Sequence, residues 1–214
     1  MNEMLIRISD AVYDGQVKEI AGLTQSALTA GVSPKDILDK GLLVGMDLVG
    51  VDFKSGRKFV PEVMLAARTM QTSLDILKPR LAETGATLRG KVLIATVKGD
   101  LHDIGKNLVG MMMRGAGFEV VDLGKDIAPE KFVEAVWKEQ PHILAMSALL
   151  TTTMRSMGDT VEAIEDAGLR DKVKIMVGGA PVTADFAKHI GADAYAPNAP
   201  MAAALAKEFV GVTL

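Results

Sequence analysis

The spacing of apolar residues changes its period near residue 85, and this change most constrains the fold. Before that point, apolar residues recur every three or four positions, the period of a helix that buries one face. From Lys91 onward, short apolar runs of strand length alternate with helix-length segments. We therefore predict a helical domain at residues 1–84, a linker at 85–90 and an α/β domain at 91–214.

The first half predicts four helices in an antiparallel bundle, because its stripes are joined by short connections. Gly31 ends the second stripe, and Ser33-Pro34 supplies an N-cap and a proline at the first helical position of the third. A polar, glycine-containing break at 53–58 separates the third helix from one that Pro61 opens. The apolar stripes span residues 5–12, 17–28, 37–46 and 63–77.

The second half predicts a flavodoxin-like (Rossmann-type) fold, a doubly wound parallel sheet of five strands. Strands separated by helices require right-handed crossovers, which place helices on both faces of a parallel sheet. The strand candidates are Val92–Val97, Glu119–Leu123, Ile143–Ser147, Val173–Val177 and Ala192–Tyr195.

Composition excludes several classes of function. The 214 residues include 24 basic and 27 acidic ones, a formal net charge of −3, without the basic run that nucleic acid or an anionic membrane would require. No apolar stretch is long enough for a bilayer span and no signal peptide is recognisable, so we expect a cytoplasmic protein. Without cysteine, a transition metal would be held by nitrogen, oxygen or a cofactor ring.

The run Asp100-Leu101-His102-Asp103-Ile104-Gly105 directly follows the first strand candidate. It places an imidazole and two carboxylates at the carboxyl end of a parallel strand, where open α/β sheets bind ligands. His102 could bind a metal through one ring nitrogen while a nearby carboxylate holds the other. Taken alone, the run fits equally well a strand-to-helix turn with Asp103 as a cap.

Two further strands end in residues that packing alone does not require. Ser147 ends the third strand and is followed by threonines at 151–153, while Gly178-Gly179 ends the fourth. Hydroxyl groups offer hydrogen bonds, and paired glycines let a ligand approach the main chain. Each has an ordinary explanation as a capping region or a turn. Their occurrence at one sheet edge beside a histidine favours a shared binding site.

Together these segments resemble the cobalamin-binding fingerprint of corrinoid-dependent methyltransferases and carbon-skeleton mutases. The run Phe59–Met64 is similar to the signature of the bundle that caps the corrinoid in methyl-transfer proteins, so the resemblance covers nearly the whole chain. Size and layout are most similar to the methyl-carrier proteins of methylamine and methanol systems, the methylamine type above all. The matched motif residues are Asp100, His102, Gly105, Ser147, Leu149, Gly178 and Gly179.

The resemblance implies that His102 is the lower axial ligand of cobalt, replacing the cofactor's own benzimidazole. Asp100 would accept the other imidazole N–H. Thr153 would end the relay, at a position where some relatives carry serine. The displaced nucleotide tail would lie near Ser147, Leu149 and the paired glycines. The implied cofactor-binding residues are Asp100, His102, Asp103, Ile104, Gly105, Ser147, Leu149, Thr151, Gly178 and Gly179, with Phe59, Val63 and Met64 as an apolar cap.

The function that the resemblance implies is a methyl shuttle based on cobalamin, as methylcobalamin or a related corrinoid. A substrate-specific amine:corrinoid methyltransferase would load the methyl group from a methylated amine. A second methyltransferase would pass it to coenzyme M or tetrahydrofolate, and a reductive activase would be a third partner. We see no separate substrate site, so we expect a carrier component in one-carbon metabolism or methanogenesis rather than a stand-alone enzyme.

Three other functions stay open. A cobalamin-dependent sensor or regulator shares the two-domain core but usually adds a DNA-binding segment. The cobalamin subunit of a mutase shares the three motifs but lacks the run that begins at Phe59. A flavodoxin-like nucleotide binder would leave His102 and the paired glycines unexplained.

Four further polar residues are candidates for contact with a ligand. Lys106 and Asn107, at a helix start, are candidate contacts to an amide or a phosphate. Asp122 and Asp126 flank Gly124 at the end of the second strand candidate. They could face the amide side chains of a corrinoid, or they could be ordinary polar residues of a loop.

Overall fold

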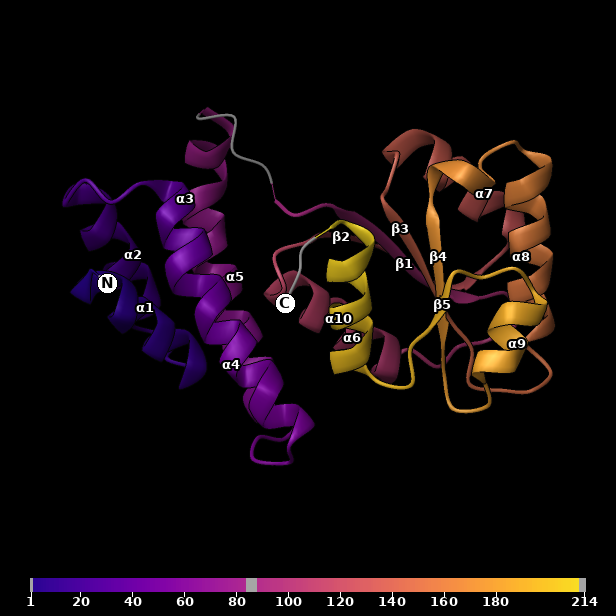
Figure 1. Ribbon diagram of the computed structural model, residues 1–214, viewed down its shortest axis with the longest axis horizontal. Helices are drawn as coiled ribbons and strands as arrows, with labels where there is room; N and C mark the ends of the chain where they lie inside the picture. The colour runs from indigo at the N-terminus through magenta and orange to yellow at the C-terminus, as the bar shows by residue number, and fades with distance from the viewer. Residues whose placement is uncertain (1, 84–87, 212–214) are drawn as a thin grey trace. The chain divides into compact units, whose positions relative to one another are not determined.

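The computed structural model describes residues 2–83 and 88–211 and separates into two units (Figure 1). One unit ends at Leu88 and also takes in Arg114–Gly117, and the other comprises the rest from Arg89 onward. Residues 85–87 of the expected linker lie outside the described residues, so the domain boundaries stay predictions. Among the residues described, no helix combines the length and the apolar character needed to cross a bilayer.

The helical unit contains the four expected helical segments, the third divided by a π-helical turn. Ser33 Oγ accepts a hydrogen bond from the Asp36 amide (3.0 Å), which confirms the predicted N-cap ahead of Pro34. The break predicted at 53–58 begins later than expected, since the helix continues to Lys54. Gly56 (φ 77°) is the first residue there with the left-handed conformation that commonly ends a helix. The elements are α1 Glu3–Tyr13, α2 Ile20–Thr29, α3 Pro34–Ile37, η1 Leu38–Leu42, α4 Leu43–Lys54 and α5 Val60–Glu83.

Close helix packing holds this unit together. A Cβ on Gly45 would lie 2.5 Å from the Ser9 carbonyl oxygen, so α1 and α4 approach as closely as glycine allows. The hydroxyls of Thr24 on α2 and Ser73 on α5 are buried and hydrogen-bonded to each other at 2.6 Å. The bundle forms because its helices bury their apolar stripes against one another, and buried polar groups such as Thr24 and Ser73 are hydrogen-bonded.

The α/β unit is a flavodoxin-like domain, as predicted. Within the described residues its five strands are all parallel, in the order β2-β1-β3-β4-β5. Helices α6 and α10 lie on one face of the sheet, and α7, α8 and α9 on the other (Figure 1). The elements are β1 Lys91–Val97, α6 Ile104–Gly115, β2 Glu119–Ile127, α7 Pro129–Glu139, β3 Ile143–Ser147, α8 Arg155–Asp166, η2 Arg170–Lys172, β4 Lys174–Gly178, α9 Ala184–His189, β5 Ala194–Tyr195 and α10 Ala199–Phe209.

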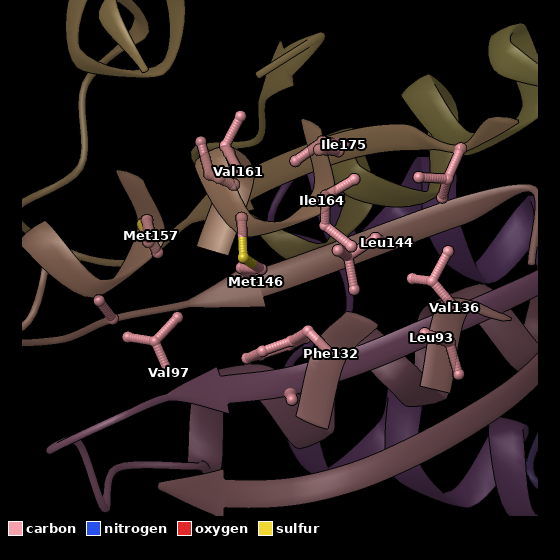
Figure 2. Packing of buried hydrophobic residues seen from close by; sticks show 14 of the residues in the cluster. Leu93, Val97, Phe132, Val136, Leu144, Met146, Met157, Val161, Ile164 and Ile175 are labelled. Carbon is pink, nitrogen blue, oxygen red and sulfur yellow. The ribbon is translucent and has the colours of Figure 1, made fainter. Parts of the chain in front are cut away.

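A buried apolar layer joins the central strands to α7 and α8 (Figure 2). Phe132 of α7 and Met157 of α8 are fully buried there against strand side chains. Strands buried on both faces read as continuous apolar runs, which is why the sequence identifies them easily. The labelled side chains of this layer are Leu93, Val97, Phe132, Val136, Leu144, Met146, Met157, Val161, Ile164 and Ile175.

The strand order places a topological switch point between the carboxyl ends of β1 and β3. The chain leaves β1 toward α6 on one face and leaves β3 toward α8 on the other (Figure 1). In doubly wound sheets this switch point is where ligands bind.

Asp193 lies at the amino end of the sheet, opposite the switch point, and its contacts make the stability of the fold depend on acid pH. Its carboxylate accepts from the Ile175 amide (2.8 Å) and pairs with Lys174 (3.1 Å) and Arg170 (2.8 Å). Burial alone would raise the pKa of Asp193, but these partners outweigh it and the pKa is lowered. A carboxyl group whose pKa is lower in the folded state stabilises the fold at pH values above its ordinary pKa of 3.8. This stabilisation is lost as the pH falls through the pKa of the folded state.

We therefore expect Asp193→Asn to be less stable than wild type at pH 7, by about 1 kcal/mol. The two should converge as the pH falls from about 5 toward 2, because the wild-type carboxylate is then protonated. Urea denaturation at a series of pH values measures this. Asp171→Asn is the control, since Asp171 is exposed. Parallel pH profiles for wild type and Asp193→Asn would contradict the assignment.

Candidate functional site

The loop after β1 is fixed to the strand from which it emerges. Gly99 turns the chain with φ 83°, a conformation that favours glycine. The Asp100 amide donates to the Val97 carbonyl (3.1 Å), and the Thr96 hydroxyl donates to the His102 carbonyl (3.0 Å). Asp100 and His102 are thus held in place before α6 begins.

Asp100 joins this loop to the loop after β3. Its side chain is completely buried, and Oδ1 accepts from the His102 amide (3.0 Å) and from ring atom Nδ1 of His102 (2.8 Å). The other oxygen, Oδ2, accepts from the amides of Leu149 (2.7 Å) and Leu150 (3.3 Å) and from the Thr153 hydroxyl (2.8 Å). One carboxylate therefore connects residues from two strand ends.

These contacts decide the charge of Asp100 and the tautomer of His102. Burial alone would raise the pKa of Asp100, but the amides of His102 and Leu149, the Thr153 hydroxyl and the His102 ring lower it far below its ordinary value. An ionised carboxylate can only accept hydrogen bonds, so Nδ1 of His102 carries the proton. The lone pair is then on Nε2.

Nε2 of His102 is available as a donor to a metal. The His102 side chain is 52% exposed, and none of the described residues hydrogen-bonds to Nε2. Among those residues no group of three or more His, Cys, Asp or Glu side chains is arranged around a metal. His102 thus offers a single protein nitrogen, which suits a metal whose other positions are filled by a prosthetic ring.

The surface around His102 is partly apolar. Ile104 is 88% exposed, and Leu101, Leu149 and Leu150 are also exposed large apolar side chains of the two joined loops. A Cβ built on Gly105 would meet no atom within 4 Å, so the protein itself does not require glycine there. Exposed apolar side chains gathered around a polar group are typical of a ligand site.

The expected hydroxyl groups lie at the same sheet edge. Ser147 ends β3 opposite Thr96 of β1 and Gly178 of β4. In the part of the chain that the structure describes, its hydroxyl has no hydrogen-bond partner. Thr151 is exposed, whereas Thr153 is buried and its single proton serves Asp100 or the Leu150 carbonyl.

The paired glycines have an internal reason that differs from the one we expected. A Cβ on Gly179 would lie 1.8 Å from the Ala148 carbonyl oxygen, and Gly179 has φ 131°. A Cβ on Gly178 would lie 2.8 Å from the Ala196 carbonyl oxygen. The main chain of neighbouring loops approaches these positions closely. The glycines are therefore required to assemble the site.

The three candidates in the helical unit differ in exposure. Phe59 is 64% exposed and Met64 46%, whereas Val63 is fully buried inside the unit. The Phe59 amide donates to the Glu62 carboxylate (2.7 Å), a capping interaction that fixes the start of α5. Phe59 and Met64 have side-chain surface to offer a ligand, and Val63 belongs to the core.

Three charged residues have roles that the sequence did not reveal. Lys106 is buried, and its Nζ lies 2.6 Å from both carboxylate oxygens of Asp122, so it is not available to a ligand. Asp126 Oδ1 accepts from the Gly99 amide (2.7 Å). The apolar pattern ends at Leu123 and so assigns Asp126 to a loop, whereas β2 continues to Ile127. The spacing of two aspartates around Gly124 was the available signal.

Comparison with known proteins matches both halves of the chain. A family model described as a B12 binding domain matches residues 90–204, and a second with the same description matches residues 5–78. The chain is 42% identical over 199 residues to trimethylamine corrinoid protein 1 of Methanosarcina acetivorans, covering 92% of each. It is 41% identical over 207 residues to dimethylamine corrinoid protein 3 of the same organism, covering 97% of each.

A solved structure has the same fold over almost the whole chain. It is the methanol:cobalamin methyltransferase complex from Methanosarcina barkeri, with a TM-score of 0.90 and 32% sequence identity. The match covers 99% of this chain and 81% of that chain. The similarity therefore includes the helical unit as well as the sheet.

Proposed function

Because this chain belongs to the family of corrinoid proteins with B12 binding domains, we propose that it carries a methyl group between two methyltransferases. Its cofactor is a corrinoid. The observation that carries the proposal is the Asp100–His102 pair, which leaves Nε2 of an exposed imidazole free at the switch point of the sheet. The chain is 42% identical to a trimethylamine corrinoid protein and 41% identical to a dimethylamine corrinoid protein, in each case over more than nine tenths of its length. This similarity supports a carrier of the methylamine type.

In this proposal Nε2 of His102 would bind the cobalt of the corrinoid. The bound corrinoid supplies a cobalt centre that takes up and releases a methyl group. Asp100 holds the proton on Nδ1, fixes the ring orientation and makes Nε2 a better donor. The amide of Leu149 and the hydroxyl of Thr153 keep Asp100 ionised and oriented.

The remaining site residues would bind the cofactor and exclude water. Ser147 and Thr151 offer hydroxyls to its polar groups, and the paired glycines let the loops after β3 and β4 come together. Leu149, Ile104 and the segment Asp103–Gly105 offer contact area beside His102. Phe59 and Met64, both exposed and apolar, are proposed to cover the cofactor.

The proposed partners are other proteins of a methyl-transfer system. Similarity to a solved methanol:cobalamin methyltransferase complex supports a substrate-specific methyltransferase as the first partner. We propose mono-, di- or trimethylamine as the donor, and a second methyltransferase that uses coenzyme M or tetrahydrofolate. A reductive activase completes the set.

We expect His102→Ala to remove nitrogen ligation and leave the fold intact. The protein is reconstituted with hydroxocobalamin, reduced to Co(II) and studied by electron paramagnetic resonance. Wild type should show superhyperfine splitting from one nitrogen, and labelling its histidines with ¹⁵N should change the pattern from a triplet to a doublet. The variant should lose the splitting and bind corrinoid at least about tenfold more weakly. Because the side chain is half exposed, stability should change by less than about 1 kcal/mol.

His189→Ala is the matched control, because His189 is exposed at the end of α9. Carrier function is measured in the same preparation. With a tri- or dimethylamine methyltransferase and no acceptor, wild type should release about one demethylated amine per corrinoid. A sensor or a mutase subunit would release none. The ligand assignment would be refuted if wild type did not retain corrinoid, or if its splitting stayed a triplet after the histidines were labelled with ¹⁵N.

A further inference from the structure

The end of the edge strand β2 is irregular where it passes the His102 loop. Ile94 pairs with Asp122, Ala95 with Gly124 and Val97 with Ile127, so the register shifts twice. Leu123 is the extra residue of β2 at the first shift, and at the second Lys125 and Asp126 together lie opposite Thr96 of β1. Bulges between parallel strands are rare, and bulges beside functional sites often re-aim a side chain.

Asp126 lies in the irregular part of β2 and has an uncommon backbone conformation. Its φ is 58°, in the left-handed region that costs free energy for residues other than glycine. In this conformation Asp126 makes two contacts to the loop after β1. Its Oδ1 accepts from the Gly99 amide (2.7 Å), and its amide donates to the Asp100 carbonyl (3.1 Å). Asp126 thus binds the two peptide groups that flank the Gly99–Asp100 peptide.

The same segment of β2 also holds the chain beyond His102. Asp122 forms a two-oxygen ion pair with Lys106, whose side chain is only 2% exposed in the first turn of α6. Asp122 Oδ1 also accepts from the Gly124 amide (2.8 Å), which stabilises the bulge itself. Residues 122–126 therefore contact the chain on both sides of His102, the loop before it and helix α6 after it.

We propose that Asp126 is a positioning residue for His102. By fixing the Gly99–Asp100 peptide, Asp126 aims the Asp100 carboxylate at Nδ1 of His102 and so orients Nε2 toward the metal. This inference rests on the proposed role of His102 as the cobalt ligand. Asp126 acts through the loop after β1 in this proposal, because Oδ1 and the amide of Asp126 both bind residues 99–100.

Three variants separate positioning from general stability. Asp126→Gly removes the carboxylate and suits φ 58°, so the fold should persist without backbone strain. Asp126→Asn keeps an acceptor oxygen and tolerates the left-handed region, so it should rescue the wild-type behaviour. Gln140→Gly is the matched control. Gln140 is the other described non-glycine residue with positive φ (45°), and it lies after α7 at the opposite end of the sheet.

Two measurements are made on each protein. Hydrogen–deuterium exchange of the cofactor-free chain reports protection of the amides of residues 99–102. Co(II) electron paramagnetic resonance and titration with hydroxocobalamin report nitrogen ligation and affinity. We expect Asp126→Gly to lose protection at residues 99–102, to weaken corrinoid binding about tenfold and to reduce the nitrogen-split fraction. Asp126→Asn and Gln140→Gly should match wild type in all three.

The outcomes distinguish this inference from the function on which it rests. If wild type shows a histidine nitrogen and Asp126→Gly is unchanged in exchange and ligation, the positioning role is wrong and the function stands. If Asp126→Asn fails to rescue, the acceptor oxygen is not what matters, and the proposal is also wrong. If wild type shows no histidine nitrogen, the proposed function fails, while loss of protection in Asp126→Gly would still establish the contact with the loop.

Discussion

Gly179→Ala is expected to lower the unfolding midpoint of the α/β unit by about 10 °C. A Cβ at this position would lie 1.8 Å from the Ala148 carbonyl oxygen, and φ 131° is unfavourable for any residue that has a Cβ. The loops after β3 and β4 would have to separate, which costs about 3–4 kcal/mol by analogy with other strained or overpacked sites. For a chain of this size, each kcal/mol shifts the midpoint by about 2–4 °C.

Calorimetry of the cofactor-free protein measures this effect. Gly158→Ala is the control within the same unit. Gly158 lies in helix α8, and a Cβ on it would be 3.5 Å from the Ile190 side chain, an ordinary van der Waals distance. That substitution should be neutral or stabilise by up to about 1 kcal/mol, since alanine favours a helix. A Gly179→Ala protein as stable as Gly158→Ala would show that the loops are not packed as described.

Gly105→Ala separates the two kinds of glycine at this site. No atom lies within 4 Å of a Cβ built on Gly105, so stability should not fall. A reduced affinity for hydroxocobalamin in this variant would indicate that the cofactor occupies the space. Gly179→Ala would instead lose stability before any ligand is added.

Asp100→Asn is expected to destabilise the protein by about 4 kcal/mol and to abolish histidine ligation. The amide has the shape of the carboxylate but only one acceptor oxygen, and the site presents donors on both sides. If its NH₂ faces His102, the His102 amide loses its acceptor, and Nδ1 must become an acceptor. The ring proton then lies on Nε2, which can no longer bind a metal.

If the NH₂ group faces the other way, the donors of Leu149 and Thr153 lose their acceptor instead. Each buried donor left without a partner costs about 1–3 kcal/mol, so either orientation is costly. Chemical denaturation gives the stability, and Co(II) electron paramagnetic resonance gives the ligation. Thr153→Ser is the control that keeps the hydroxyl. Normal nitrogen splitting in Asp100→Asn would show that Asp100 does not set the tautomer of His102.

The sequence identifies the individual segments of this fold well. The buried strands are continuous apolar runs, and the switch from one helix to the next is marked by residues such as Ser33 and Gly31, so local chemistry is enough to find them. The end of β2 is different, because Gly124 and Asp126 look like a loop. Their strand conformation depends on pairing with β1 across two bulges, which the sequence does not encode locally.

The candidate site shows the same division. His102 and Asp100 are recognisable because they are two residues apart and form a familiar motif. The partner at Thr153 was assigned by resemblance, and the structure brings it to 2.8 Å from Asp100 across 53 residues of sequence. Lys106 looked like a ligand contact, but its burial against Asp122 could be seen only after the strand and helix were packed together.

By itself, the sequence of this protein determined the period of each segment, the order of helices and strands, and the residues that can bind or release a proton at the strand ends. Those properties depend on near neighbours, whose spacing is set by the covalent chain. Only the tertiary structure decided which donors surround Asp100, why Gly179 must be glycine and what Asp126 holds. Apart from the bonds that His102 makes to Asp100, those contacts join residues at least 26 positions apart (100 and 126), and strand register and packing bring them together.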